Sequence, residues 1–155
     1  MELAVVVVGS PRTPGMARAI EEYETRARRY FRLEVAEMSA AAADDPGRAR
    51  AREGRALMGR VPDGLRLFAL TRRGKALTSD GLARHLRRTA TYGRPGAAFV
   101  VGGAHGLAPE VIERADHRLS LSPMTLPHQM ARLVLMEQIY RAGTILRGEP
   151  YHKGG

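Results

Sequence analysis

Residues Leu3–Val8 read LAVVVV, a run of apolar and mostly β-branched side chains with no polar interruption. A strand covered on one face only alternates apolar with polar residues, so this run predicts a strand buried on both faces. Four further β-like runs follow along the chain, at Leu33–Met38, Leu65–Leu70, Ala97–Val101 and Leu119–Ser122.

Helical stretches separate these runs. They are predicted at Met16–Phe31, Arg48–Gly59, Ser79 or Asp80 to Tyr92, Pro109–Ala115 and Pro127–Leu146. The alternation predicts an α/β fold: a mostly parallel sheet of five to six strands with helices on both faces. Such sheets bind ligands beyond the carboxyl ends of their strands, so the loops after Leu70, Val101 and Leu121 are the first candidates for a site.

The length and composition exclude several classes of protein. The chain has 155 residues, which suits a single domain over residues 1–155. It has no cysteine, which excludes a disulfide scaffold, a thiolate zinc site, an iron–sulfur cluster and a cysteine nucleophile. No apolar run approaches the roughly 18 residues that a membrane span requires. A signal peptide begins with basic residues, whereas this chain has the acidic Glu2 there. We therefore expect a soluble cytoplasmic protein.

The net charge is +9, and it is unevenly distributed. Residues 1–96 hold 19 basic and 11 acidic side chains, whereas residues 97–155 hold 6 and 5. Arginine outnumbers lysine 23 to 2, as expected of a GC-rich genome, but that bias does not explain the excess over acids. Because polyanions are attracted to such a surface, we expect the first two thirds of the chain to face nucleic acid.

Two loops are candidates for ligand binding. The sequence GGAHG at 102–106 follows a predicted buried strand, and glycines let the backbone approach a ligand closely. The second loop begins at Leu121–Leu126 and contains Pro123 and Pro127. These prolines predict a stiff, extended segment, whose backbone groups are free to bind a flat polar ligand such as adenine. Each loop also has a plain interpretation, as a glycine-rich turn or as a connection that caps a helix.

The stretch Pro127–Leu146 is apolar on several sides, so it is expected to be buried or to pack against a second subunit. Arg132 and Arg141 interrupt this apolar surface. Each is interpreted either as a solvated charge or as a partner of Glu137.

The remaining histidines and the tail leave further alternatives open. His85 and His117 are expected at surface or strand positions, and no histidine or carboxylate pair has the spacing of metal ligands, so no metal is expected. The tail after Gly148 carries Tyr151 and His152 next to a proline. A polar terminus usually frays, so a frayed end and a functional tail both remain open.

Taken together, these features resemble one family. The segments VVGGAHGL (Val100–Leu107), LSLSPMTLPHQMARLVLMEQIYRA (Leu119–Ala142) and PYHK (Pro150–Lys153) are similar to the ribosomal RNA large subunit methyltransferase H family of the SPOUT superfamily. The similarity extends over essentially the whole chain, through VVVVG near the start and ALTRRGK at 69–75. The second and third of these segments are the most specific.

The resemblance implies a fold, an activity and partners. The fold is an α/β domain with a C-terminal trefoil knot, which acts as a homodimer. The activity is methylation of N3 of a pseudouridine in a 23S rRNA stem-loop, on the assembled 70S ribosome. The methyl donor is S-adenosyl-L-methionine, and the target is bound at the subunit interface. From the spacing and hydropathy described above, we expect neither a metal nor a membrane partner.

The resemblance also implies site residues. The donor is expected to contact the three loops named above, at Leu70, Gly102, Leu121, Ser122, Pro123, Met124, Thr125 and Leu126. Tyr151, His152 and Arg132 match residues on the substrate side. N3 of a uracil-type ring carries a proton at neutral pH, so we expect His152 to accept it and Arg132 to stabilise the developing charge.

Three alternatives qualify this prediction. Positioning alone suffices if the proton is lost directly to water. A catalytically inactive, basic ribosome-binding or assembly factor of the same fold would share the charge distribution. A methyltransferase of the same superfamily acting on tRNA is disfavoured by the short chain, which shows no added RNA-binding domain.

Overall fold

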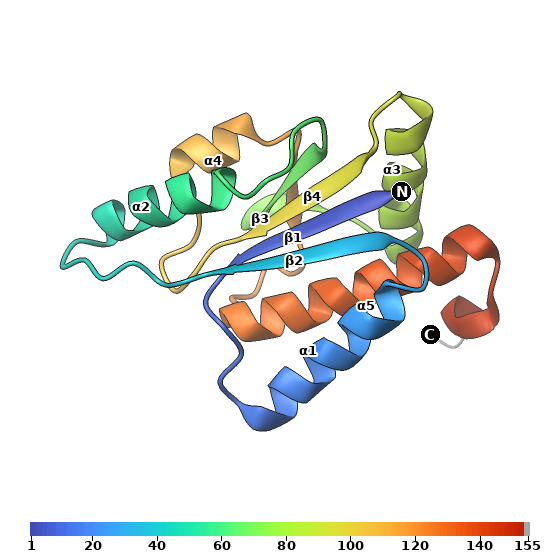
Figure 1. The fold of residues 1–155 in the computed structure, drawn as a ribbon, viewed down its shortest axis with the longest axis horizontal. Coiled ribbons are helices and arrows are strands. Elements are labelled where there is room, and N and C mark those ends of the chain that lie inside the picture. The colour runs from blue at the N-terminus through green and yellow to red at the C-terminus, as the bar shows by residue number, and fades with distance from the viewer. Residues whose placement is uncertain (154–155) are drawn as a thin grey trace.

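The computed structural model describes residues 1–153, with side chains through Tyr151. Strands and helices alternate along the chain, as the sequence predicts (Figure 1). The elements are β1 (Glu2–Val8), α1 (Pro14–Ala27), β2 (Arg32–Met38), α2 (Pro46–Met58), β3 (Arg66–Ala76), α3 (Ser79–Thr91), β4 (Gly96–Val101), α4 (Pro109–Arg114), β5 (His117–Ser120), α5 (His128–Arg147) and the 3-10 helix η1 (Pro150–Lys153).

The five strands form one parallel sheet in the order β2-β1-β4-β3-β5. The two most apolar strands, β1 and β4, lie side by side, and every residue of β4 is buried. Unbroken apolar runs suit these positions because both faces of a central parallel strand are covered. The predicted α/β fold with a parallel sheet is confirmed.

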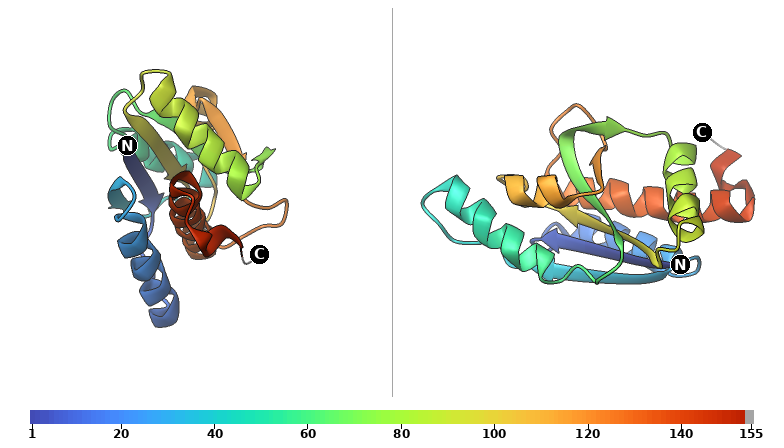
Figure 2. Two further views of the ribbon diagram at one scale, coloured as in Figure 1. Left: turned by 90° about the vertical axis from the view of Figure 1, so that its right-hand side faces the viewer. Right: turned by 90° about the horizontal axis from the view of Figure 1, so that it is seen from above.

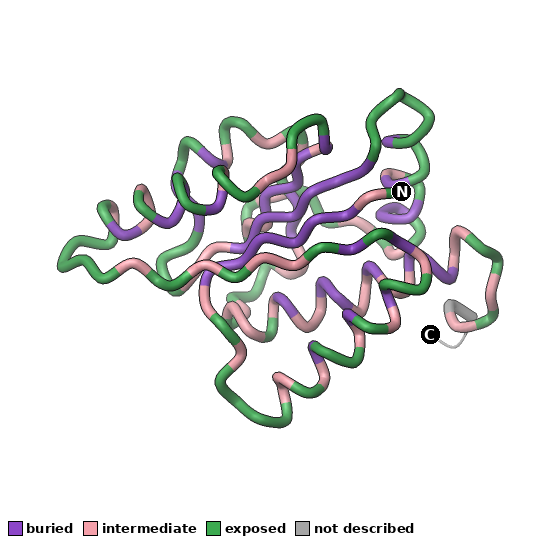
Figure 3. The backbone as a smooth tube through the Cα atoms, viewed as in Figure 1, coloured by how far each residue is buried: buried purple, intermediate pink, exposed green. Residues whose placement is uncertain are grey.

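Helices cover both faces of the sheet, so the molecule has three layers (Figure 2). On one face, α1, α3 and α5 pack on alternate side chains of the strands, among them Val5, Phe68 and Phe99. On the other face, α2 and α4 pack on the intervening side chains, such as Val6 and Val100. Figure 3 shows the buried residues concentrated in the central strands and on the inner sides of the helices.

The third strand is longer than predicted. Residues 71–75, expected to form a basic loop after Leu70, belong to β3, which runs to Ala76. Both Leu70 and Lys75 lie opposite Leu119 of β5, so the residues between them bulge out of the ladder. Gly74 makes this possible, because a Cβ there would lie 2.6 Å from the backbone of Arg118. Alternation of side chains cannot predict a bulge of this kind.

Other boundaries shift by a few residues. The last strand is His117–Ser120 instead of Leu119–Ser122. Thr78, not Ser79 or Asp80, caps α3 through a hydrogen bond that its Oγ1 accepts from the Gly81 amide. Pro127 lies immediately before α5 and not inside its first turn. No helix among the described residues is both long enough and apolar enough to cross a membrane.

Candidate active site

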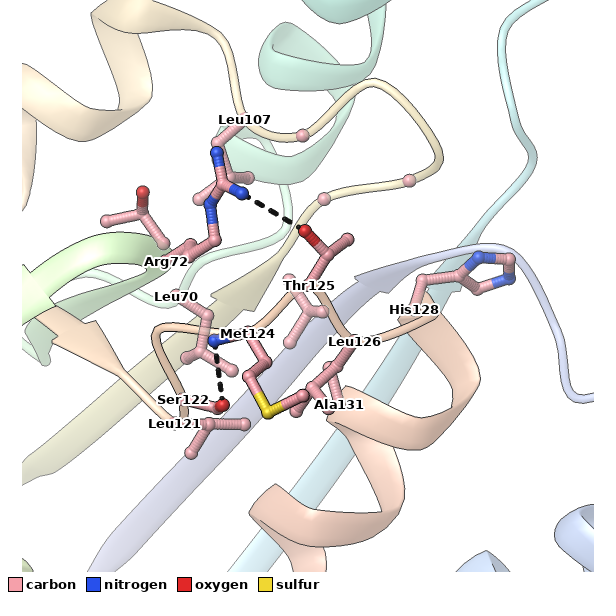
Figure 4. Close-up of a pocket in the computed structure, with 15 residues that line it drawn as sticks. Leu70, Arg72, Leu107, Leu121, Ser122, Met124, Thr125, Leu126, His128 and Ala131 are labelled. Carbon is pink, nitrogen blue, oxygen red and sulfur yellow. Dashed lines mark hydrogen bonds between the residues drawn. The ribbon is translucent and has the colours of Figure 1, made fainter. Parts of the chain in front are cut away.

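A pocket of about 360 Å³ opens beside residues 70–72 of β3 and at the carboxyl ends of β4 and β5, where the sequence predicts a ligand (Figure 4). The middle of β3, the loops after β4 and β5, and the first turn of α5 form its walls. Of the residues predicted to contact the donor, Leu70, Gly102, Leu121, Ser122, Met124, Thr125 and Leu126 line it. Pro123 is not among the residues that line the pocket. The structure thus brings together residues that are up to 56 positions apart in sequence.

The glycine loop forms one wall through its backbone. The amide of Gly106 donates a hydrogen bond to the carbonyl of Gly103 at 3.0 Å, which closes a tight turn. A Cβ on Gly102 would lie 2.6 Å from the carbonyl carbon of Gly106. The loop therefore requires glycine at position 102 because its own backbone occupies the space of a side chain.

The opposite wall is the loop between β5 and α5. The Ser122 hydroxyl accepts a hydrogen bond from the Met124 amide at 3.0 Å, and Ser120 donates to the Ser122 carbonyl. Arg72 of β3 donates to the hydroxyl of Thr125 at 3.1 Å across the mouth of the pocket. These bonds hold a segment that has no helix or strand of its own.

Sequence reasoning missed several residues of the pocket. Arg72 lines it because β3 continues beyond Leu70, and His128 and Ala131 line it because α5 begins at its edge. The basic run after Leu70 was the available signal for Arg72. No acidic side chain is among the described residues that line the pocket, so Arg72 gives its mouth a positive charge.

Arg132 lies in a different environment from the one predicted. It is not among the residues that line the pocket, and only 5% of its surface is exposed. Its guanidinium donates to Glu24 of α1 and to Glu37 of β2, each at 2.7 Å. Burial alone would raise the pKa of Glu37, but hydrogen bonds from Ser10 and Arg132 outweigh it and hold this pKa below its ordinary value. Arg132 thus anchors α5 to two other elements, and its catalytic role stays a prediction.

We expect Arg132→Ala to destabilise the fold. The substitution leaves the largely buried carboxylate of Glu24 with only the longer pair to Arg28, at 3.8 Å, and breaking a buried ion pair costs up to about 3–5 kcal/mol. Urea unfolding measures this change. Arg87→Ala, at an exposed position of α3, is the control and should change the free energy of unfolding little. Unaltered stability of Arg132→Ala, with loss of methyl transfer, would contradict the anchoring role and support the predicted catalytic role.

The tail folds back on α5. The Tyr151 hydroxyl donates to Glu137 at 3.1 Å, its ring centroid lies 4.7 Å from that of Tyr140, and the Arg141 guanidinium lies 4.8 Å from the Tyr151 ring centroid. Burial raises the pKa of Tyr151, and so do hydrogen bonds with Tyr23 and Glu137. Arg141 also pairs with Glu137 at 2.9 Å, so one of the two predicted partnerships of Glu137 is confirmed.

Tyr151 lies outside the pocket of its own chain. Ala131 lines the pocket, whereas Tyr151 contacts α5 at Glu137 and beyond, about 9 Å further along the helix axis at 1.5 Å per residue. The side chain of His152 lies outside the described part of the chain, so its catalytic role stays a prediction. Within the described residues, no group of three potential metal ligands occurs.

Comparison with known proteins places this geometry in a family. The model of the family described as "Predicted SPOUT methyltransferase" matches residues 1–152. The chain is 47% identical to the ribosomal RNA large subunit methyltransferase H of Gemmatimonas aurantiaca, over 99% of this chain and 100% of that protein. It is 35% identical to the protein of that name from Clostridium perfringens, with the same coverage.

Solved structures show the same fold at lower identity. TrmJ from Z. mobilis superposes with a TM-score of 0.55 at 16% identity, over 92% of this chain and 70% of that chain. A structure described in terms of 2-OH methylation of C/U34 on tRNA superposes with a TM-score of 0.52 at 23% identity, over 93% and 92%. From its full-length match and its close relatives, the chain belongs to the SPOUT methyltransferase family, in the group of ribosomal RNA large subunit methyltransferase H proteins.

Proposed function

We propose that this protein transfers a methyl group from S-adenosyl-L-methionine to N3 of a pseudouridine in 23S rRNA, on the assembled 70S ribosome and as a homodimer. The observation that carries the proposal is the pocket beside β3 and at the ends of β4 and β5, which is lined by seven of the eight residues that the family resemblance assigns to the donor. The relatives' names, which specify large-subunit ribosomal RNA, support the class of substrate.

The walls of the pocket fit the proposed donor. Its volume of about 360 Å³ lies within the range of small-molecule sites. Leu70, Leu107 and Leu121 offer apolar surface for a flat base, and the backbone of the glycine loop offers polar groups. Arg72 offers a positive charge at the mouth for a carboxylate. S-adenosylmethionine bound here would supply an electrophilic methyl group.

The chain's own residues then have two tasks. The first is to hold the target nitrogen in line with the methyl group, since positioning accounts for much of the acceleration in such a displacement. The second is to remove the proton from N3, which we assign to His152 as a neutral imidazole. Arg132 is already paired with two carboxylates, so we assign it the positioning of α5 beside the pocket.

The excess of positive charge supports an RNA substrate. Arg48, Arg52 and Arg55 lie exposed along α2, and the net charge is +9. Phosphate contacts from such residues add affinity but select no sequence. Recognition of one nucleotide then depends on the shape of the bound ribosome and on the pocket.

Methyl transfer with isotopically labelled donor distinguishes the candidate functions. We expect stoichiometric donor binding by calorimetry and label in the 23S rRNA of 70S ribosomes. Donor or ribosome binding without transfer would favour the inactive assembly factor. Label in tRNA alone would favour the third candidate. Absence of donor binding would overturn the proposed site.

We expect a homodimer in solution. Met130 of α5 is 36% exposed and Met124 beside the pocket is 75% exposed, which leaves apolar surface next to the site. Light scattering at micromolar concentration should give twice the mass of the chain, and Met130→Glu should shift it towards the monomer. Tyr92→Glu, at an exposed residue that caps α3, is the matched control and should remain dimeric. A monomeric wild-type protein would contradict the proposal.

A further inference from the structure

A second hollow, of about 280 Å³, lies between the end of β3 and the helix α3. Its lining shares no residue with the donor pocket. We call it the α3 basic pocket, and its lining is Lys75, Ala76, Leu77, Thr78, Gly81, Arg84, His85 and Arg88. Nothing in the donor site uses these side chains.

Two elements bring the cations of this pocket together. Four of the lining residues lie on one face of α3, because they follow one another at helical spacing: Gly81, then Arg84, His85 and Arg88 three, four and seven residues later. Lys75 comes from the end of β3, beyond the bulge that the sequence did not predict. Lys75, Arg84 and Arg88 are all exposed, so their charges are accessible to a ligand.

The pKa of His85 reflects the charges that surround its ring. It is half-buried, and the ring of His117 lies 4.7 Å from its ring, between centroids. Burial lowers the pKa of His85, and the nearby cations Arg66, Lys75, Arg88 and Arg84 lower it further. Among the described residues, the carboxylate of Asp116 shifts the pKa of His117, but no carboxylate shifts the pKa of His85. The charged groups that shift the pKa of His85 are therefore all cations.

These cations form no ion pair within 4.0 Å among the described residues, although Asp80 lies one turn before Arg84 on α3. The ion pairs formed by the described residues all join other side chains, and none includes Lys75, Arg84 or Arg88. Arg84 and Arg88 are four residues apart on α3, where like charges destabilise a helix. Three exposed cations around one hollow attract an anion.

We propose that the α3 basic pocket binds a phosphate group of the RNA backbone. Guanidinium and ammonium groups bind phosphate through charge-assisted hydrogen bonds, and two arginines four residues apart on one helix face can donate to the same phosphate group. The choice of RNA over a free phosphate ion rests on the proposed function, whereas phosphate binding rests on the pocket alone. The contact adds affinity and orients the enzyme on the ribosome without reading sequence.

The test uses the full-length protein and the triple variant Lys75→Ala, Arg84→Ala, Arg88→Ala. The charge-matched control for the phosphate titration is Arg48→Ala, Arg52→Ala, Arg55→Ala on α2, which removes three exposed cations that lie outside the α3 basic pocket. Inorganic phosphate is titrated first, and the His85 ring is followed by NMR. A bound anion stabilises the imidazolium, so we expect phosphate to raise the pKa of His85 in the wild type and control but not in the pocket variant.

Binding to 70S ribosomes is measured next, at several salt concentrations. We expect the pocket variant to bind at least about tenfold more weakly at low salt, with a shallower dependence on salt, because each lost phosphate contact lowers that slope by about one. Donor binding by calorimetry should be unchanged, since the two pockets share no residue.

Each contrary outcome has a distinct meaning. A His85 pKa that phosphate leaves unchanged in the wild type, or a phosphate response that the α2 control loses too, overturns the site. A normal phosphate response with unaltered ribosome affinity in the pocket variant identifies a site for free anions and overturns the RNA proposal. Wild-type protein that binds ribosomes through this pocket but transfers no methyl group would contradict the proposed function and leave this inference standing.

Discussion

Gly102→Val should abolish binding of S-adenosylmethionine. The added Cβ would lie 2.6 Å from the carbonyl carbon of Gly106 and 2.7 Å from its oxygen, and no flexible side chain is present to move aside. The turn that Gly103 and Gly106 close must open, and the wall of the pocket moves with it. The clash is thus with the protein's own backbone and not with the ligand directly.

Calorimetry measures the effect, and two other glycines serve as controls. Gly15→Ala in α1 places a Cβ where no atom lies within 4 Å, so donor affinity should stay at the wild-type value. Gly106→Ala also meets no atom, but Gly106 has a φ of +77°, so it tests strain at the same turn without a clash. Such strain costs of order 1–2 kcal/mol, so Gly106→Ala should lose less affinity than Gly102→Val. Wild-type affinity in Gly102→Val would remove the glycine loop from the donor site.

Removal of residues 150–155 should abolish methyl transfer while donor binding persists. A terminus of this kind usually tolerates truncation. Here Tyr151 packs on Tyr140 and Arg141 and bonds to Glu137, so the tail is held against α5 before any substrate arrives. Stacking of Tyr151 on the target base would add about 1–3 kcal/mol. A single-turnover assay measures the loss, and full activity of the truncated protein would show that the proton acceptor lies elsewhere.

The point variants separate the two residues of the tail. His152→Ala should lower the single-turnover rate by roughly 10²–10⁴-fold, the range for a general base, with a smaller change in ribosome affinity. Tyr151→Phe keeps the stacked ring and removes only the hydroxyl that bonds to Glu137, so it should lose less activity than Tyr151→Ala. Equal losses in the two Tyr151 variants would indicate that the hydroxyl, and not the ring, is what matters.

Mixing two inactive proteins tests which pocket the tail serves. Tyr151 lies away from the pocket of its own chain, so we expect it to serve the partner's pocket. A truncated subunit keeps its pocket, and a Gly102→Val subunit keeps its tail. Random mixing makes half of the dimers hybrid, each with one complete site, so activity should return to about a quarter of the wild-type value. No recovery, despite hybrid dimers, would show that each tail serves its own pocket.

The strands and the donor pocket were predictable because their signals are local. Unbroken apolar runs indicated that β1 and β4 are buried, and parallel topology places the loops after successive strands at one edge of the sheet. The resemblance then supplied residues in those same loops. The ion pair between Glu137 and Arg141 could also be predicted, since a spacing of four residues on a helix brings side chains together.

The remaining features depend on contacts between distant parts of the chain. Arg132 pairs with Glu24 and Glu37, which are 108 and 95 residues away, and no periodicity in α5 indicates such partners. The continuation of β3 beyond Leu70 depends on the close packing of Gly74 against the backbone of β5. The predicted trefoil knot and the predicted absence of a metal remain predictions.

Mass spectrometry of 23S rRNA tests the central claim most directly. RNA is taken from a strain that lacks the gene and from the same strain with the gene restored, and the fragment with the target pseudouridine is compared. We predict that the fragment loses the mass of one methyl group in the deletion strain and regains it with the wild-type gene but not with Gly102→Val. An identical methylated fragment in the deletion strain would contradict the proposed function.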